Sequence, residues 1–560
     1  MKRSLNQLGC TEFDVVIVGG GAFCAAAAWD ASLRGLHVAL IEQADFGSGA
    51  SAECFKFVHG GIRYLQHGNL KRLWSSSRER SALLRIAPHL VKPVPIVIPT
   101  FGSGRKGKGF LGTGMMVYDL LTLGRNGGIA DPSRHVLPTT FMSRSELLGL
   151  FPELDQPQLT GGAVFADGQM YSPPRLVLAF VESAFRKGAC VANYVQATDF
   201  LWEGNRVRGV RARDTLGGEE FDIRGRLVLN AAGPWAEYLF SDRGRFGDHR
   251  RGNFSRDACF IIRRKPRSDY ALAVPGQSRD RDTLVSRESR HLFAVPWRDY
   301  TLIGVWHRLF AEKPDRARID EAELEAWIAE MNASCPALAL RREEVSYANC
   351  GLVPFGAATG ANELSFGKES RFIDHRFTHG IQGLVTLIGI RYTTARGDAA
   401  TALDLLLRQW HGSPPPGSST AHTALVGGEI AQVDALRESL SRQRPSGVSD
   451  RTLEALLRNH GTEAAALLRR VKPGSTEITV ARSDTLVAEV LNAVDLEAAM
   501  RLEDVVLRRT DLGNGAHPGR AALEAAADAM AAPLVWNCER RGEEIASTER
   551  VLAQHHALEG

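Results

Sequence analysis

The sequence predicts an α/β protein. A Rossmann-like dinucleotide-binding domain is combined with a mixed-sheet substrate domain and a separate all-helical C-terminal domain. Three observations lead to this prediction. A glycine turn joins a short apolar run to an alanine-rich helix near residue 20, two later apolar runs are followed by glycine turns, and residues 426–560 are overwhelmingly helical in pattern. Strands that alternate with helices are typical of parallel sheets covered on both faces.

The turn at residues 19–21 is predicted to bind a pyrophosphate, because it follows an apolar strand at 15–18 and precedes a helix at 22–34. Gly19 permits the sharp turn, and Gly21 lets backbone N–H groups approach the phosphates at the positive end of the helix. Glu42 closes a second strand 21 positions after Gly21, where it can accept hydrogen bonds from a ribose. On these residues alone, an ordinary strand-to-helix turn is the alternative.

Cys24 stands where the pattern GxGxxG has its third glycine. That position lies where the helix packs closely on the sheet. Cysteine is small and apolar, so we interpret it as a tolerated packing change.

Later segments are predicted to return to the same sheet. These are "RLVLNAAGPW" at 226–235 and the strand, glycine turn and helix at 383–410. A chain that comes back to wrap its cofactor favours a tightly held FAD over an exchangeable NAD. The predicted domains are a discontinuous FAD-binding domain (1–75, 160–240 and 355–410), a substrate domain (76–159 and 241–354), a linker (411–425) and a helical domain (426–560).

The composition excludes several classes of protein. At 560 residues the chain can hold several cores, and a net charge of +4 does not indicate a polyanionic partner such as nucleic acid. Eight cysteines without a CxxC pair fit a reducing compartment better than a disulfide scaffold or a zinc site, and the histidines show no metal-ligand spacing. With neither a signal-peptide core at the first residues nor a run of roughly 18 apolar residues, the expected location is cytoplasmic.

The segment 104–125 has two interpretations. Arg105, Lys106 and Lys108 precede an apolar stretch rich in leucine and methionine. Its length suits a helix that lies in a membrane interface with the cations near lipid headgroups. The alternative is a buried helix of the substrate domain.

Six motifs in order resemble the FAD-dependent glycerol-3-phosphate dehydrogenases and oxidases over residues 12–555. They are "VVIVGGGAFCAAAAWDASLRGLHVALIEQADFGSGAS", "KFVHGGIRYLQHGNLK", "ERSALLRIAPHLVKP", "LVLNAAGPWAE", "IRYTTARGDAATALDLL" and "RLEDVVLRRTDLG". The resemblance implies an FAD-binding fold of the glutathione-reductase and D-amino-acid-oxidase type. It also implies hydride transfer from a secondary alcohol to flavin N5, with quinone or oxygen as electron acceptor.

The resemblance assigns candidate roles to single residues. His59, Arg63 and Tyr64 keep the family's HGG(x)RY pattern, in which Arg63 can pair with an anion and Tyr64 can donate a hydrogen bond to it. His59 is either the base that takes the carbinol proton or a residue that orients the flavin loop. Arg371 falls where the family places a phosphate-binding arginine, and Arg391 stands where it has a lysine.

The cofactor-binding residues implied by the resemblance lie in four stretches of the chain. They are Gly19, Gly21, Ala22, Phe23, Glu42, Gln43, Ser51, Lys56, Val195, Ala232, Gly233, Gly389, Tyr392 and Thr393.

Departures from the family's patterns gather on the substrate side. Val353 replaces an arginine expected on the substrate phosphate, a loss of roughly 1.5 to 3 kcal/mol of binding. Phe55 stands in the loop that reads Ser-Ser-Lys in relatives, and Cys259 falls where a histidine is expected. The pattern "GTTD" becomes "GVWH", which introduces Trp306 and His307. Trp306 is interpreted as core packing or as a wall of the pocket.

Three functions follow from this pattern. The first is oxidation of a small anionic alcohol, with sn-glycerol 3-phosphate the default. The second is the same reaction on another alcohol or an amine, and the third is a flavin-binding partner protein without turnover. The predicted partners are the phosphorylated alcohol, a quinone or oxygen, the inner membrane surface and a second copy of the chain.

Overall fold

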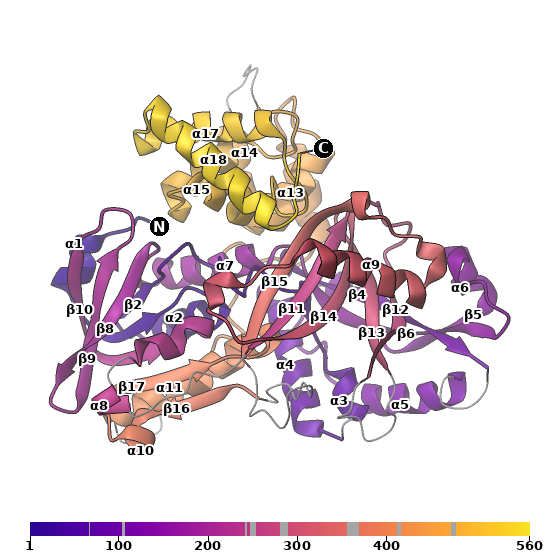
Figure 1. Ribbon diagram of the computed structural model, residues 1–560, viewed down its shortest axis with the longest axis horizontal. Coiled ribbons are helices and arrows are strands. Elements are labelled where there is room, and N and C mark those ends of the chain that lie inside the picture. The colour runs from indigo at the N-terminus through magenta and orange to yellow at the C-terminus, as the bar shows by residue number, and fades with distance from the viewer. Residues whose placement is uncertain are drawn as a thin grey trace.

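The computed structural model describes residues 1–66, 68–102, 107–240, 243–246, 254–279, 289–354, 369–411, 416–471 and 478–559. Two sheets lie side by side, and the C-terminal helices cover them from one side (Figure 1). The predicted α/β fold class with a helical C-terminal part is confirmed.

The first sheet carries the glycine turn. Its strands are β1 (Glu12–Val18), β2 (Val38–Ile41), β7 (Cys190–Ala192), β8 (Val195–Glu203), β9 (Arg206–Asp214), β10 (Glu220–Asn230), β16 (Arg371–Asp374) and β17 (Leu384–Ile388). The order is β16-β17-β10-β1-β2-β7, and β17, β10, β1, β2 and β7 are parallel. Parallel strands end at one edge of the sheet, so Gly19, Glu42, Ala231 and Gly389, each of which directly follows a strand, meet there.

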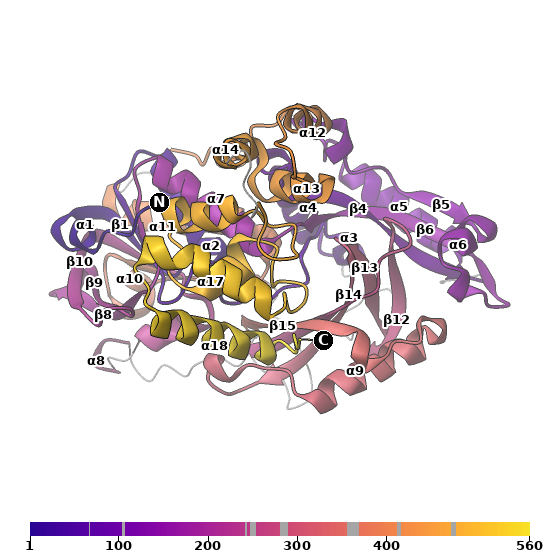
Figure 2. The same cartoon turned by 90° about the horizontal axis from the view of Figure 1, so that it is seen from above.

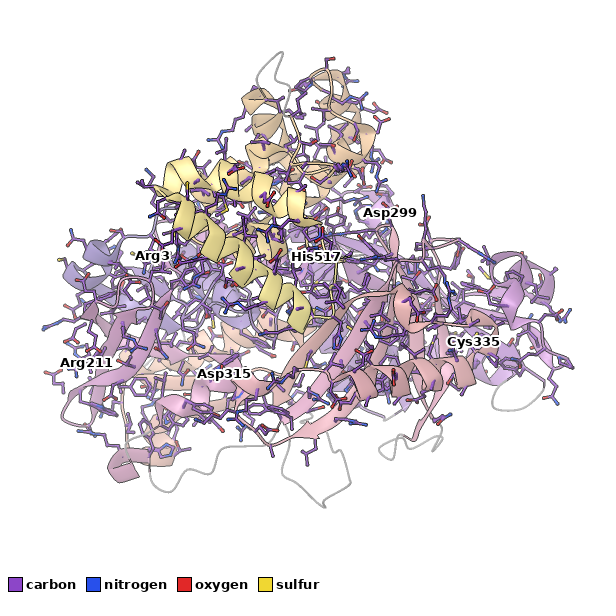
Figure 3. All side chains as sticks on the ribbon, turned by 45° about the horizontal axis from the view of Figure 1, so that its top comes forward. Arg3, Arg211, Asp299, Asp315, Cys335 and His517 are labelled. Atoms are coloured by element: carbon purple, nitrogen blue, oxygen red, sulfur yellow. The ribbon has the colours of Figure 1, made fainter. Side chains whose placement is uncertain are left out.

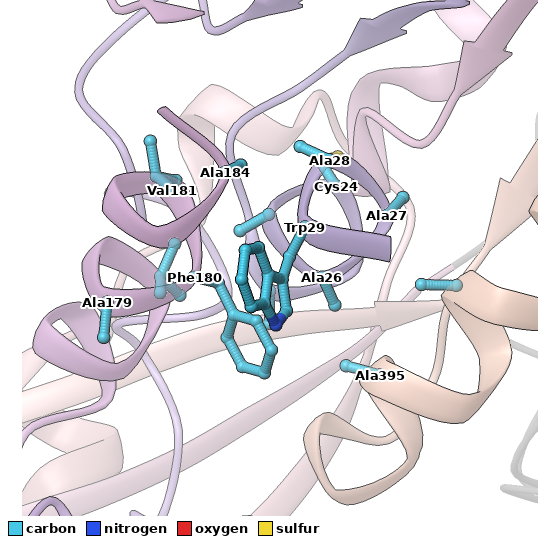
Figure 4. Packing of buried hydrophobic residues seen from close by; sticks show 14 of the residues in the cluster. Cys24, Ala26, Ala27, Ala28, Trp29, Ala179, Phe180, Val181, Ala184 and Ala395 are labelled. Carbon is cyan, nitrogen blue, oxygen red and sulfur yellow. The ribbon is translucent and has the colours of Figure 1, made fainter. Parts of the chain in front are cut away.

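Helices cover one face of this sheet and a hairpin covers the other. Helix α2 (Ala22–Leu33) packs against α7 (Pro173–Arg186) and α11 (Ala395–His411). Trp29 and Phe180 lie between α2 and α7 (Figure 4). The alanines of α2 are buried because the helix is enclosed on several sides. On the other face, β8 and β9 form the predicted hairpin, and α1 (Leu5–Cys10) joins the core there.

The second sheet is built around long antiparallel pairs. Its strands are β3 (Phe57–Val58), β4 (Val91–Phe101), β5 (Thr140–Ser143), β6 (Leu159–Met170), β11 (Phe254–Ile262), β12 (Ala271–Arg279), β13 (Ser289–Trp297), β14 (Tyr300–Phe310) and β15 (Val345–Pro354). The order is β15-β11-β14-β13-β12-β4-β6-β3. Strands β3 and β6 fall almost wholly within ranges predicted for the FAD-binding domain, but they pair here because β6 forms a long ladder with β4.

The two faces of the second sheet have different partners. Helices α6 (Arg144–Leu150) and α9 (Glu321–Ser334) cover the outer face. The inner face packs against C-terminal helices and borders the cavity described below.

Five further helices precede the C-terminal part among the described residues. They are α3 (Ile62–Gln66), α4 (Leu70–Ile86), α5 (Lys108–Leu121), α8 (Arg243–Phe246) and α10 (His375–His379). Helix α5 lies within the segment 104–125, of which Arg105 and Lys106 fall outside the described residues. Among the helices that the structure describes, none is long and apolar enough to cross a bilayer.

The C-terminal part is helical, as the sequence predicts. It contains α12 (Val433–Arg442), α13 (Asp450–His460), α14 (Ala464–Arg470), α15 (Val487–Glu497), α16 (Leu502–Asp504), a π-helical turn (Val505–Arg509), α17 (Arg520–Leu534) and α18 (Cys538–Gln554). Helix α18 runs towards β15 (Figure 2), and the His555 carbonyl just beyond it accepts a hydrogen bond from the Ala348 amide at 2.7 Å.

Candidate functional site

One large cavity lies between the carboxyl edge of the first sheet and the inner face of the second. Its volume is about 1340 Å³, larger than the roughly 300–1,000 Å³ of a site for one drug-sized ligand. Residues of both sheets and of the C-terminal helices line it. This size suits a dinucleotide together with a small substrate.

Most residues predicted from the sequence meet in this cavity. Its lining includes Gly19, Gly21, Ala22, Phe23, Glu42, Gln43, Ser51, Lys56, His59, Arg63, Tyr64, Val195, Ala232, Gly233, Gly389, Arg391, Tyr392 and Thr393. Arg371 does not belong to this lining. It lies on β16, and its Nη2 donates to Glu237 at 2.9 Å.

The glycine turn and Glu42 form what we call the cofactor end of the cavity. The Gly20 amide donates to Glu42 Oε2 at 2.5 Å, and the Ala44 amide donates to Oε1 at 2.9 Å. The Ala22 amide, in the first turn of α2, donates to Ser51 Oγ at 3.0 Å. Burial raises the pKa of Glu42 to about 7, although both backbone hydrogen bonds oppose the shift.

Two glycines at the cofactor end leave no room for a side chain. Gly19 has φ of +111°, and a Cβ there would lie 2.9 Å from both Ala232 Cα and Cys24 Sγ. A Cβ on Gly389 would lie 2.2 Å from the Phe23 ring. The backbone can therefore approach a ligand closely at both points. With an acidic residue after β2 and the N-terminus of α2 at the cavity, these residues fit a dinucleotide such as FAD.

Cys24 occupies its glycine position without a void. Its side chain is completely buried, and Sγ lies 3.0 Å from the Ala231 carbonyl oxygen and 3.7 Å from that of Val18. Burial raises the pKa of the thiol well above its ordinary value. The sulfur thus fills the contact between α2 and the ends of β1 and β10.

The loop around His59 is fixed by a buried acid and base. Arg80 is fully buried, and its Nη1 donates to Asp167 Oδ1 at 2.7 Å, while the Gly60 amide donates to the same oxygen at 2.5 Å. Burial would raise the pKa of Asp167, but His59 and Arg80 outweigh it and lower the pKa. His59 Nδ1 lies 3.7 Å from Asp167 Oδ2, and the His59 amide donates to Thr393 Oγ1 at 2.9 Å.

Cationic residues gather around Tyr64. Arg391 Nη1 donates to Ser76 Oγ at 2.8 Å and to Tyr64 Oη at 3.4 Å. The guanidinium of Arg72 lies over the Tyr64 ring at 4.5 Å, and that of Arg391 at 5.4 Å. Arg63 lines the cavity beside Tyr64. This wall, defined by Arg63, Tyr64 and Arg391, is named the cationic wall, and it suits an anionic ligand.

Lys56 is a buried cation in the lining. The residue is only 3% exposed, and its backbone has φ of +59°. Nζ donates to Asn349 Oδ1 at 2.9 Å and lies 4.9 Å from the centre of the Trp297 ring. Asn349 in turn donates to Glu53 Oε2 at 3.1 Å. Lys56 thus joins the loop before β3 to β15.

Another part of the lining is the inner face of the second sheet. Val353 lines it, and Phe55 packs against Phe57 and Phe293 with ring centroids 5.5 and 6.0 Å apart. His307 also lines it and pairs with Asp257, the Nδ1–Oδ1 distance being 2.7 Å. We call this the sheet wall.

Trp306 faces away from the cavity. Its ring stacks between Phe260 and Trp327, and Nε1 donates to Glu330 at 2.8 Å. Of the two interpretations of Trp306, the structure supports core packing.

Several functional candidates gave no recognised signal in the sequence. Asp167 lies in the second half of β6, and Asp257 lies on β11. Asp315, labelled in Figure 3, lines the cavity and accepts a hydrogen bond from Trp235 Nε1 at 3.1 Å. Arg508 belongs to the quoted motif "RLEDVVLRRTDLG" and also lines the cavity. That motif is the sequence signal from which a contact between the C-terminal helical part and the cavity could have been predicted.

Asp45 connects the cofactor end to the C-terminal helices. Its buried carboxylate accepts hydrogen bonds from Arg508 Nε at 2.6 Å, from Arg509 Nη1 and Nη2 at 2.7 Å each, and from Asn193 Nδ2 at 2.9 Å. Burial alone would raise the pKa of Asp45, but Arg509 and Arg508 outweigh it and lower the pKa to about 2. The loop that follows Glu42 is therefore held in place by two arginines of the C-terminal helical part.

Comparisons with known proteins show the class to which the chain belongs. The family model "FAD dependent oxidoreductase" matches residues 14–392, and the model "C-terminal domain of alpha-glycerophosphate oxidase" matches residues 418–541. The class of protein is therefore an FAD-dependent oxidoreductase, and its cofactor is FAD. This sets aside the alternative of a flavin-binding protein without turnover.

Within that class, the chain belongs to the family of FAD-dependent glycerol-3-phosphate dehydrogenases and oxidases. A glycerol-3-phosphate dehydrogenase of Synechocystis sp. is 27% identical over 99% of this chain and 98% of its own. The human mitochondrial enzyme is 28% identical over 98% of this chain and 74% of its own. The glycerol-3-phosphate dehydrogenase of Bacillus halodurans, solved with FAD, has the same fold, with a TM-score of 0.74 at 21% identity over 98% of this chain and 96% of that one.

Proposed function

We propose that the protein oxidises the secondary alcohol of a small anionic substrate, by default sn-glycerol 3-phosphate to dihydroxyacetone phosphate. The observation that supports this most strongly is that one cavity is lined both by the glycine turn with Glu42 and by the cationic wall of Arg63, Tyr64 and Arg391. A dinucleotide end and an anion-binding end in one enclosure suit a redox reaction on an anionic alcohol.

In this proposal the cofactor end holds FAD. Gly19 and Gly21 admit the pyrophosphate to the N-terminus of α2, and Glu42 accepts hydrogen bonds from the ribose. Bound FAD supplies the acceptor, at flavin N5, for the hydride of the alcohol. The segment from Gly389 to Thr393, which follows β17, is proposed to close over the flavin.

The cationic wall is proposed to hold the anionic group of the substrate. Arg391 keeps a fixed direction because Ser76 accepts a hydrogen bond from its Nη1. Its other guanidinium hydrogens can then be donated to phosphate oxygens, and Tyr64 Oη can donate as well. Arg371 lies on β16, donates to Glu237 and is not among the residues that line the cavity. Its predicted contact with the substrate phosphate is therefore not part of this proposal.

For His59, the proposal takes the orienting role. Its backbone amide joins the loop before α3 to Thr393, and its ring stacks on Phe57 with centroids 5.7 Å apart. The nearest Asp167 oxygen is 3.7 Å from Nδ1, beyond hydrogen-bonding distance. His59 thus links the two segments that enclose the flavin position.

Anaerobic reduction of the bound flavin tests the proposal. The purified holoenzyme is mixed with sn-glycerol 3-phosphate without oxygen, and the loss of flavin absorbance is followed. Rapid bleaching is expected. An oxidised spectrum that persists with this alcohol, while dithionite still bleaches the flavin, contradicts the proposed substrate.

A second candidate keeps the reaction and changes the substrate to another alcohol or an amine. It is favoured by the sheet wall, where Val353 offers no charge and Asp257 adds a carboxylate. Faster bleaching by an uncharged polyol or an amine than by glycerol 3-phosphate supports this candidate over the first.

We further propose that the protein works at the inner membrane surface and passes electrons to a quinone or to oxygen. Met116, Leu120 and Leu123, spaced on one face of α5 and its end, are 71, 66 and 75% exposed. Trp74 on α4, also exposed, donates from Nε1 to the Leu121 carbonyl at 3.0 Å and extends this apolar patch. Such a patch suits the interface of a bilayer.

Sedimentation with anionic phospholipid vesicles tests the surface. The double substitution Leu120→Glu and Leu123→Glu is expected to lower the bound fraction at least tenfold while flavin content is unchanged. Leu496→Glu, on α15 at the opposite side in Figure 1, is the matched control because Leu496 is 49% exposed. Equal vesicle binding by the parent protein, the double variant and Leu496→Glu contradicts the proposed surface.

A further inference from the structure

The sheet wall carries a pair of residues that the proposed reaction has not yet used. His307 on β14 and Asp257 on β11 are directly opposite each other in the register of these strands, and both line the cavity. The Asp257 carboxylate also receives a hydrogen bond from Ser255 Oγ at 2.6 Å. Its Oδ1 is thus held by two donors, Ser255 and His307.

The register places this pair beside the substrate-side departures. On β11, Ser255 is opposite Val353 of β15, and Asp257 is opposite Gly351. Residues two apart on a strand share a face, so Val353, Asp257 and His307 face the cavity together. Trp306, one residue before His307, is packed on the outer face of the sheet, as this alternation requires.

We propose that His307, oriented by Asp257, is the general base that takes the hydroxyl proton of the alcohol. The inference rests on the proposed function, since it names the residue that completes that reaction. A base held by a third group is the arrangement that fixes both tautomer and direction. With Nδ1 hydrogen-bonded to the carboxylate, Nε2 is the basic nitrogen, as in other histidines paired with a carboxylate.

The step is balanced by the groups already named. The carbinol C–H bond breaks and its electron pair leaves with the hydrogen as a hydride, which the bound FAD accepts. The O–H bond breaks and its proton passes to Nε2 of His307, so that a carbonyl forms. The proton then leaves to solvent through the cavity mouth.

His59, His555 and Cys259 also line the cavity but are less suited to this role. His59 lies 3.7 Å from its nearest carboxylate oxygen, and that carboxylate is already bound by Arg80 and the Gly60 amide. His555 has Nδ1 only 2.9 Å from the Ala348 carbonyl and stacks on Tyr347, so it supports the wall. Burial raises the pKa of Cys259 to about 12, which keeps its thiol protonated.

The pair also orients the substrate. Asp257 places negative charge on the sheet wall, which disfavours a phosphate there and leaves the cationic wall as its site. The carbinol carbon of a phosphorylated alcohol then faces His307. The family resemblance leads us to expect a histidine at position 259 on β11, where this chain has Cys259. In this chain the imidazole of His307 lies instead on β14, the strand that pairs with β11.

The experiment compares flavin reduction in three variants of the holoenzyme. His307→Gln is expected to lower the rate constant of reduction by sn-glycerol 3-phosphate by a factor of about 10² to 10⁴, the usual contribution of a general base. Asp257→Asn is expected to lower it roughly 10- to 100-fold, as loss of an orienting partner does. His135→Gln is the matched control, because His135 bonds the Ile129 carbonyl at 3.0 Å away from the cavity lining.

Rescue separates a base from a structural residue. Added imidazole is expected to raise the rate constant of flavin reduction in His307→Ala at least tenfold. It is expected to leave the rate constant of His135→Gln unchanged. A second readout needs no turnover: diethyl pyrocarbonate is expected to modify His307 in the parent protein, and saturating glycerol 3-phosphate is expected to protect it. A His307→Gln rate within threefold of the parent, absence of rescue, or unprotected modification overturns the proposal.

The outcomes also separate this inference from the proposed function. If the parent flavin is bleached by glycerol 3-phosphate and the His307 variants match it, the inference alone fails. If the parent flavin is not bleached by this alcohol, the proposed substrate fails, whatever the variants do.

Discussion

The cofactor end and the sheet wall of the same cavity differ in how far they keep the family's residues. At the cofactor end, Glu42 accepts a hydrogen bond from the glycine turn and Ser51 accepts one from the first turn of α2, while Cys24 Sγ contacts two carbonyl oxygens. At the sheet wall, Val353 and the His307–Asp257 pair alter both the charge and the acid–base groups.

The largest expected effect is the loss of stability and of bound FAD when Asp45, next to the cofactor end, is replaced. Asp45→Ala leaves Arg508 and Arg509 buried without their shared carboxylate, a change that costs about 3–5 kcal/mol. We expect the free energy of unfolding in urea to fall by that amount and bound FAD to be lost on dilution.

Asp450→Ala is the control for this comparison. Asp450 pairs with Arg444, but its side chain is 90% exposed, and exposed pairs contribute about 0–1 kcal/mol. Equal destabilisation by the two substitutions would show that Asp45 has no special role.

The second prediction restores charge at the sheet wall. Val353→Arg is expected to tighten binding of glycerol 3-phosphate by about 1.5–3 kcal/mol, which is ten- to a hundredfold. Equilibrium binding is measured from the perturbation of the flavin spectrum. Turnover is not used, because Asp257 lies on the same face of the sheet as the new guanidinium and an ion pair between them would change the rate for a separate reason. Val353→Met adds bulk without charge, and the same gain in that variant counts against the electrostatic explanation.

The third prediction concerns Glu42 and pH. Burial raises the pKa of Glu42 to about 7 from an ordinary 4.5. The cofactor-free protein therefore holds an additional proton between these values, and this carboxyl's contribution to folding stability is lost as pH rises through 7. FAD affinity should change in the opposite direction, since the ionised carboxylate accepts the ribose hydrogen bonds.

Titration of the cofactor-free protein with FAD measures this effect. Affinity is expected to rise about tenfold from pH 6 to pH 8, and Glu42→Gln should make it independent of pH. A parent protein whose affinity does not change over this range contradicts the assigned role of Glu42.

The smallest expected effect is at Cys24. Cys24→Ala removes a buried sulfur and its contact with the Ala231 carbonyl but keeps a good helix former, so the loss of stability should be about 1 kcal/mol or less. Thermal unfolding of the holoenzyme measures it, with FAD content as the second readout. A loss of FAD would show that the sulfur is more than packing.

Some parts of the site were predictable because their residues are close in sequence. The strand, glycine turn, helix and acidic residue of 15–42 form one local unit, and their spacing predicts a nucleotide site, with an ordinary strand-to-helix turn as the alternative on these residues alone. The Arg391 and Thr393 segment was found through a resemblance over a motif rather than through its own chemistry. Arg371 shows the limit of that approach, because a matching motif placed it at the substrate while β16 carries it outside the cavity lining.

By itself, the sequence determined the α/β class and the helical C-terminal part, since each depends on periodicity or on residues a few positions apart. Only the tertiary structure decided which side chains meet across long separations. His307 and Asp257 are 50 residues apart and meet through strand register, and Asp45 reaches Arg508 over 463 residues. Register and domain packing bury these charges together, and no local pattern of residues encodes that choice.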